Sequence, residues 1–255
     1  MNITKIINDL DFISIRVQED NLMYLFFDET SAFSFDASSP KAILHALSCD
    51  FQKQNYTEDE IYQLKPSKNR KLLYSFTTHS HFDHNGGDAE LKKLYPTINM
   101  VNFSNYKNFD NFNISKFEVI PIETPCHTLD SLCYLVKNTL TNKSYTVTGD
   151  FIFKLGCGKF FEGNAAMFID SLNKLISKLD KSTLLLYGHD YYIANRKFTE
   201  QFYSINDCEN FFLTLEEEQK YNPFFKAMNS EIIEGEKEER IDKLRKLKNN
   251  FKFQN

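Results

Sequence analysis

The chain has 255 residues, 42% of them hydrophobic and 25% charged, which is the ordinary range for one large globular domain or two small ones. Thirty Lys and Arg stand against 35 Asp and Glu, a formal net charge of −5, which excludes a surface built throughout to bind nucleic acid. The start lacks an apolar leader, no apolar run approaches bilayer length, and five Cys without disulfide-like spacing suit a reducing compartment, so we expect a soluble cytoplasmic protein.

The first two-thirds of the chain alternates apolar runs of strand length with segments of helical spacing. The runs that end in polar residues or glycine predict strands at residues 22–27, 72–77, 117–122, 132–136, 145–148 and 184–187. Between them, helical spacing predicts helices at residues 42–47, 88–95 and 165–179. This alternation predicts a layered α/β fold.

Strand signals stop after about Tyr192, and residues 198–251 favour helix with a break at Asn222-Pro223. The last part carries one apolar stripe, formed by Ile241, Leu244, Leu247 and Phe251. Arg245 and Lys248 lie on neighbouring turns near the edge of this stripe. Charge alone favours interpreting this Lys-rich tail as a solvated helical face.

A dense cluster of potential metal ligands directly follows the predicted strand at residues 72–77. Four such side chains fall within six residues: His79, His81, Asp83 and His84. Imidazole nitrogens and a carboxylate suit zinc, and a ligand set with more oxygen atoms suits iron or manganese. A single histidine is usually an ordinary surface or core residue, but four potential ligands just after one strand favour a metal site.

Three later residues of the same kind each follow a predicted strand. They are His127, Asp150 and His189. Active sites of layered α/β folds gather at strand ends, so these three are candidates for the same site.

Two cysteines offer an alternative chemistry, because Cys126 beside His127 resembles a thiol–imidazole pair and Cys157 lies in a glycine-flanked loop. Neighbours on an extended run point to opposite faces, so Cys126 cannot readily use His127 as its base. We interpret Cys157, which has a glycine on each side, as a small packed residue rather than a nucleophile.

The complete series of ligand-type residues is similar to the ligand set of the metallo-β-lactamase superfamily, an αββα sandwich that binds two metals between its sheets. Within that superfamily the chain resembles glyoxalase II, the hydroxyacylglutathione hydrolases. The matching stretches are 124–128 (TPCHT), 149–150 (GD), 156–163 (GCGKFFEG), 188–191 (GHDY), 222–224 (NPF) and 244–248 (LRKLK). The resemblance implies a metallo-β-lactamase-like catalytic domain at residues 1–190 and a C-terminal α-helical, glutathione-binding domain at residues 191–255.

The same resemblance implies roles for individual residues. It places His79, His81 and His127 on a first metal, Asp83, His84 and His189 on a second, and Asp150 between the two. Two divalent ions are implied, taken as zinc with iron or manganese as alternatives, and Asp83 and Asp150 are the implied catalytic carboxylates. Substrate contacts are implied for Lys159, Phe161, Tyr191, Arg245 and Lys248, although Phe161 stands where many relatives have Tyr.

The implied activity is hydrolysis of S-D-lactoylglutathione and other S-2-hydroxyacylglutathiones to glutathione and D-lactate, the second step of methylglyoxal detoxification, by a monomer with no nucleic-acid or membrane partner. The enzymatic alternatives are another hydrolase of the superfamily, such as a lactamase or lactonase, an iron-dependent persulfide dioxygenase, or a nuclease, which the net charge of −5 disfavours. An alternative of a different class is a catalytically silent metal-binding scaffold.

Overall fold

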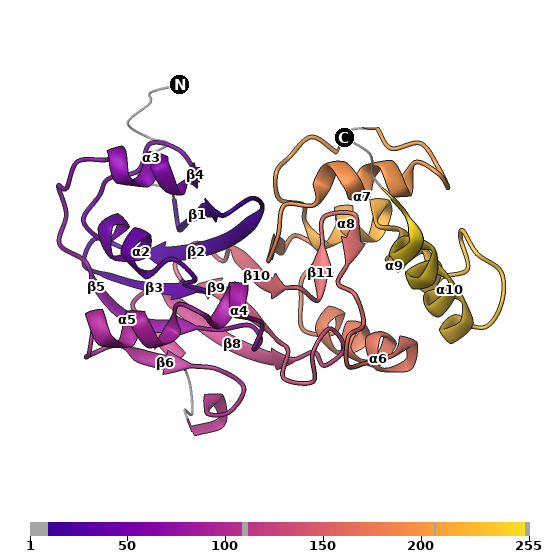
Figure 1. Ribbon diagram of the computed structural model, residues 1–255, viewed down its shortest axis with the longest axis horizontal. Coiled ribbons are helices and arrows are strands. Elements are labelled where there is room, and N and C mark those ends of the chain that lie inside the picture. The colour runs from indigo at the N-terminus through magenta and orange to yellow at the C-terminus, as the bar shows by residue number, and fades with distance from the viewer. Residues whose placement is uncertain (1–9, 109–111, 207, 253–255) are drawn as a thin grey trace. The chain divides into compact units, whose positions relative to one another are not determined.

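The computed structural model describes residues 10–108, 112–206 and 208–252 (Figure 1). The chain forms two compact units: unit 1 comprises residues 1–120 and 137–142, and unit 2 comprises residues 121–136 and 143–255. The boundary expected after residue 190 divides the chain by function rather than by packing, and it stays a prediction. Within the described ranges, no helix is both long and apolar enough to cross a bilayer.

Unit 1 is organised around a six-stranded mixed sheet with the strand order β4-β1-β2-β3-β5-β6. Its strands are β1 (Phe12–Val17), β2 (Asn21–Phe27), β3 (Ser31–Phe35), β4 (Asn55–Thr57), β5 (Lys71–Phe76) and β6 (Asn99–Val101). β1, β2 and β3 pair antiparallel through short turns, whereas β5 runs parallel to both β3 and β6. Parallel pairs need crossover connections.

Those crossovers carry four helices in the described part of unit 1. They are α2 (Pro40–Ala46), α3 (Glu58–Gln63), α4 (Phe82–Asn85) and α5 (Asp88–Leu94). A 3₁₀ turn, η1 (Tyr106–Asn108), and a hairpin of β7 (Phe112–Ile114) with β8 (Phe117–Glu123) follow β6.

The central strand β2 shows why this sheet is buried on both faces. All seven of its side chains are buried, and alternation sends Tyr24 and Phe26 to one face and Met23 and Leu25 to the other. Phe26 stacks on Phe33 with ring centroids 5.2 Å apart, and such a pair contributes about 0.5–1.5 kcal/mol beyond the area it buries. A strand covered on both faces reads as one continuous apolar run, which is how the sequence predicted it.

In unit 2, β10 (Ser144–Gly149) lies between β9 (Leu132–Asn138) and the parallel strand β13 (Leu184–Tyr187). A small hairpin follows β10 and consists of β11 (Ile152–Phe153) and β12 (Gly156–Cys157). The helices are α6 (Ala165–Ile176), α7 (Tyr192–Thr199), α8 (Leu215–Tyr221), α9 (Pro223–Met228) and α10 (Lys237–Asn250). α10 packs against α9 and α6, and α8 packs against α9 (Figure 1).

The predicted layered α/β arrangement is confirmed, as are all six predicted strands and the three helices between them. The third helix ends at Ile176 rather than at residue 179. The unpredicted elements are strands β1, β3, β4, β6, β7, β11 and β12 and helices α3 and α4.

The predicted helical tail is partly wrong. The break at Asn222-Pro223 is confirmed, because Asn222 ends α8 and its side chain caps the start of α9. Residues 200–206, 208–214 and 229–236 are not helical, and α7 begins earlier than predicted, at Tyr192. In the expected apolar stripe, Ile241 and Leu244 are buried, but Leu247 is 44% exposed. The buried part of the stripe is therefore shorter than the spacing predicted.

Candidate active site and its metal ligands

The predicted ligands of unit 1 lie together just beyond the end of β5. His79 Nε2 lies 3.1 Å from His81 Nδ1, and the rings of His79 and His84 have centroids 4.2 Å apart. Asp83 Oδ2 lies 3.7 Å from His84 Nε2. His81 precedes the first residue of α4, and this short helix then presents Asp83 and His84. The structure therefore brings these four predicted ligands into one group.

A buried carboxylate, Asp36, orients this group. It follows β3 at a positive φ of 50°, and it accepts hydrogen bonds from the Thr78 amide at 2.7 Å and the Thr78 hydroxyl at 2.8 Å. His84 Nδ1 lies 2.9 Å from Asp36 Oδ2, and since a carboxylate only accepts, Nδ1 carries the proton. His84 Nε2 is then left with the lone pair that a metal needs.

The same reasoning fixes the ring of His79. The Thr78 hydroxyl donates its hydrogen bond to Asp36, so it can only accept a hydrogen bond from His79 Nδ1, at 3.0 Å. The lone pair of His79 is therefore on Nε2. Asp36 and Thr78 are functional residues that the sequence did not predict.

The predicted ligands of unit 2 converge on the Asp150 carboxylate. Its Oδ2 lies 3.4 Å from His127 Nε2 and 3.6 Å from His189 Nε2. Asp150 follows β10 and His189 follows β13, two neighbouring parallel strands whose carboxyl ends meet at one edge. Gly188 is required here, because a Cβ at that position would lie 2.3 Å from Asp150 Oδ1.

The geometry of this second group fits a bound cation. His127 Nδ1 lies 2.8 Å from the Lys159 carbonyl oxygen, which only accepts, so Nδ1 is protonated. In a neutral imidazole the lone pair of Nε2 then faces the negatively charged oxygen of Asp150. Two acceptors in contact repel each other unless a positive charge lies with them. Nitrogen and carboxylate donors in this arrangement suit a divalent metal ion.

The predicted substrate contacts lie in unit 2, and three of them surround its ligands. Phe161 is 57% exposed and lies edge-on to the His127 ring, with centroids 5.2 Å apart. Lys159 Nζ lies 4.8 Å from the centre of the Phe161 ring. Tyr191 stacks on His189 with an interplanar angle of 3°.

The two predicted contacts from α10 behave differently. Arg245 is only 7% exposed and donates hydrogen bonds to backbone carbonyl oxygens of the loop after β12. Lys248 Nζ donates to the Ala194 carbonyl oxygen at 3.4 Å and lies over the Phe198 ring. Burial, with a contribution from the Arg245 charge, lowers the pKa of Lys248 to about 8.

The cysteines are unsuited to nucleophilic chemistry. Cys126 is buried with its thiol directed at the Asn164 carbonyl, and burial raises its pKa far above the ordinary thiol range. Burial also raises the pKa of Cys157 to about 11, against the opposing charge of Arg245. Both thiols are therefore protonated near neutral pH.

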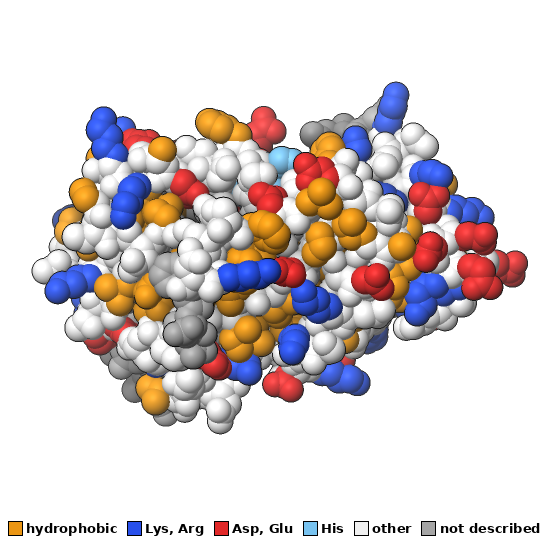
Figure 2. Space-filling model, turned by 90° about the horizontal axis from the view of Figure 1, so that it is seen from below, with side chains coloured by type: hydrophobic (Ala, Val, Ile, Leu, Met, Phe, Trp, Pro, Cys, Tyr) orange, Lys and Arg blue, Asp and Glu red, His pale blue; other side chains and the backbone are white. Residues whose placement is uncertain are grey.

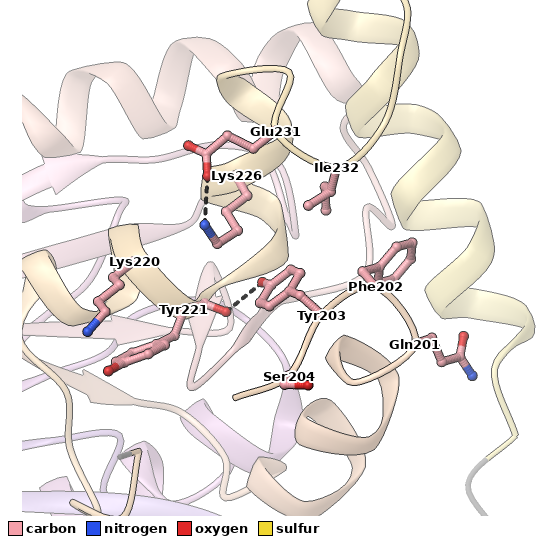
Figure 3. A pocket seen from close by; sticks show the side chains of 9 residues that line it. All are labelled: Gln201, Phe202, Tyr203, Ser204, Lys220, Tyr221, Lys226, Glu231 and Ile232. Atoms are coloured by element: carbon pink, nitrogen blue, oxygen red, sulfur yellow. Dashed lines mark hydrogen bonds and ion pairs between the residues drawn. The ribbon is translucent and has the colours of Figure 1, made fainter. Parts of the chain in front are cut away.

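A separate cavity of about 630 Å³ in unit 2 holds none of the predicted site residues. Figure 3 shows its lining between the end of α7, the end of α8 and α9. Lys226 is paired with Glu231 at 2.6 Å, and Tyr203 donates to the Tyr221 carbonyl oxygen. Its one carboxylate, Glu231, is engaged by Lys226, and the nine lining residues include neither His nor Cys, so the ligand groups remain the candidate active site.

Charge is not concentrated on the visible surface. On the face in Figure 2, Lys and Arg side chains are interspersed with Asp and Glu, and apolar side chains lie among them. The net charge of −5 is what disfavours a nuclease.

Comparison with solved structures identifies the fold. The chain is similar to a protein named ETHE1 from Myxococcus xanthus, with a TM-score of 0.64, 21% identity, and coverage of 93% of this chain and 90% of that one. It is also similar to a metallo-β-lactamase from Staphylococcus aureus, with a TM-score of 0.63, 18% identity, and coverage of 93% and 66%. No family model matches the sequence. The chain has the metallo-β-lactamase fold.

Comparison with curated relatives narrows the class to a family. A probable hydroxyacylglutathione hydrolase from Encephalitozoon cuniculi is 40% identical over 250 residues, which cover 95% of this chain and 98% of that protein. A relative from Arabidopsis thaliana, named as a cytoplasmic hydroxyacylglutathione hydrolase, is 29% identical over 91% of this chain and 94% of its own length. The chain belongs to the hydroxyacylglutathione hydrolase family, as its sequence motifs predicted.

Proposed function

We propose that this protein hydrolyses the thioester bond of S-D-lactoylglutathione and other S-2-hydroxyacylglutathiones, releasing glutathione and the 2-hydroxy acid. Family membership supports this substrate class. The structural observation that carries it is the fixed imidazole tautomer at His84 and at His127, each with Nδ1 bound to an oxygen acceptor and the lone pair on Nε2. A silent scaffold would have no need for ligands prepared in this way.

We further propose that the seven predicted ligands together hold two divalent ions, most simply zinc, with iron or manganese as alternatives. Bound metals would supply a hydroxide near neutral pH and polarise the thioester carbonyl. The partly exposed carboxylate of Asp83 can accept a hydrogen bond from the attacking water and orient it. The leaving group is a thiolate, which departs without the protonation that an amine requires, so no general acid is needed.

Glutathione carries two carboxylates and one ammonium group, and its binding calls for local cations. The exposed Lys159 supplies one such charge, and its position over the Phe161 ring limits where the ammonium group can move. Lys248, with a pKa of about 8, is mostly protonated at neutral pH and supplies a second. The proposal includes a cytoplasmic location, which is also the location in the name of the Arabidopsis relative, and a monomeric state.

The test is hydrolysis of S-D-lactoylglutathione by the purified full-length protein, with elemental analysis of bound metal. We expect turnover that a chelator abolishes and that added zinc restores. Parallel assays use nitrocefin for a lactamase and oxygen uptake with glutathione persulfide for a dioxygenase. Activity in either parallel assay without thioester hydrolysis would overturn the proposal, and bound metal with no activity in all three would favour the scaffold.

A further inference from the structure

Helix α10 is attached to the loop after β12 by a buried arginine. Arg245 Nη1 donates to the carbonyl oxygens of Cys157, at 2.8 Å, and Gly158, at 3.3 Å. Its Nε donates to Asn249 Oδ1 at 2.9 Å, which holds the guanidinium in place from the next turn of the helix. Hydrogen bonds from a charged group to buried carbonyls are among the stronger ones in proteins.

The other side of the same loop contacts two predicted metal ligands. The carbonyl oxygen of Lys159 accepts a hydrogen bond from His127 Nδ1 at 2.8 Å. Gly158 packs so closely that a Cβ there would lie 1.9 Å from the Asp150 carbonyl oxygen and 2.8 Å from His127 Nδ1. Residues 157–159 therefore lie between Arg245 on one side and His127 and Asp150 on the other.

Because of this placement, Arg245 can affect the metal ligand His127 through the loop backbone. If the guanidinium is removed, the carbonyls of Cys157 and Gly158 lose their buried donor, and the loop backbone is free to shift toward other partners. A shift at Gly158 also moves the Lys159 carbonyl, which selects the tautomer and orientation of His127. Outer hydrogen bonds of this kind typically change metal affinity 10–100-fold.

We propose that Arg245 is a positioning residue for the metal ligand His127, so that α10 determines metal affinity as well as glutathione binding. The inference rests on the proposed function only for the identity of the ligands. It differs from the role implied by the family resemblance, in which Arg245 contacts glutathione directly.

The test compares zinc affinity in the wild-type protein, Arg245→Met and Lys246→Ala, by competition with a chromophoric chelator. Met keeps the length of the side chain but donates no hydrogen bond. Lys246 is adjacent and solvent-exposed, and it serves as the matched control. We expect zinc affinity to fall about tenfold or more in Arg245→Met and to stay at the wild-type value in Lys246→Ala.

A folded Arg245→Met with wild-type zinc affinity and a raised KM for lactoylglutathione would overturn the proposal, since it would leave only a substrate contact. Should Arg245→Met fail to fold, Arg245→Lys decides, because an ammonium group cannot reproduce the fixed fork of donors. Weakened zinc binding in that variant supports the proposal and unchanged binding overturns it. Zinc affinity is measured without any thioester, so absence of hydrolysis in the wild type would count against the proposed function alone.

Discussion

Asp36 lies outside every predicted ligand position, yet its carboxylate controls two ligands. It accepts a hydrogen bond from His84 Nδ1 directly and, through the Thr78 hydroxyl, keeps the proton of His79 on Nδ1. These partners lie 42 and 48 residues away along the chain. A local motif cannot reveal such a pair, whereas the spacing of His79 and His81 was visible because those ligands are close in sequence.

Replacing Asp36 with Asn tests this control. The Asn side chain has an NH₂ group in place of one carboxylate oxygen, and this group faces a donor of Thr78 or His84. At least one hydrogen bond is then lost, and the tautomer of His84 is no longer fixed. We expect Asp36→Asn to lower zinc affinity about 10–100-fold, measured by chelator competition. The exposed Asp59→Asn serves as the control in the same unit, and equal zinc affinity in both variants would contradict this role of Asp36.

At the scale of elements, helix α8 is joined to the surrounding strands by one buried carboxyl group. Glu218 accepts hydrogen bonds from the Tyr187 hydroxyl at 2.8 Å and from Asn222 Nδ2 at 2.7 Å. Asn222 Nδ2 also donates to the Gly156 carbonyl oxygen at 3.0 Å. Tyr187 ends β13 and Gly156 begins β12, so α8 holds both elements that lead to predicted site residues.

This carboxyl group predicts a pH dependence of stability. Burial raises the pKa of Glu218 to about 7 from an ordinary 4.5, so the folded protein binds this proton more tightly than the unfolded chain. The contribution is complete below about pH 4.5 and is lost as the pH rises toward 7; it amounts to no more than about 3 kcal/mol.

We expect Glu218→Gln, which cannot ionise, to flatten the part of the urea-unfolding free energy that falls between pH 4.5 and 7. The control is Glu216→Gln, since Glu216 lies on the same helix with its side chain 68% exposed. An unchanged pH profile in Glu218→Gln would show that the carboxyl group does not carry this dependence.

Two of the strands that the sequence missed, β1 and β3, have a physical cause in common. Both contain buried serines, which interrupt an apolar pattern. Ser14 donates to Asn55 Oδ1 at 2.6 Å and Ser34 donates to Ser75 at 2.9 Å. Each partner is 41 residues away, so the satisfaction of these hydroxyls depends on tertiary contacts that local periodicity does not contain. β2 and β13, which carry no such interruption, were predicted correctly.

The predicted helix through residues 200–214 failed for a related reason. Ile205 and Leu213 are buried, as a helical interpretation would require. Leu213 is held by its carbonyl oxygen, which accepts from the amide of Leu185 in β13. Ile205 and Leu213 pack together with Leu155, which lies between β11 and β12, so they are covered by a tertiary cluster and not by forming a helical stripe.

For the molecule as a whole, we expect metal binding to raise thermal stability. Metals that bind the folded chain and not the unfolded one stabilise it by about 2.7 kcal/mol at a free concentration of 100 Kd. For a protein of this size that corresponds to roughly 5–10 °C in Tm. Calorimetry of the zinc-loaded protein with and without a chelator measures the shift, and magnesium is the control ion. A Tm that is indifferent to chelation of demonstrably bound zinc would contradict the assignment of buried ligands.

All five cysteines are buried without disulfides, and burial raises the pKa of each thiol, to about 12 for Cys133 and about 11 for Cys208. Electrophiles attack the thiolate, and these thiols are both protonated and screened from solvent. The thiols of the folded protein are consequently poor sites for addition of α-oxoaldehydes. An enzyme proposed to act in the removal of such compounds would thus be protected from inactivation through its cysteines.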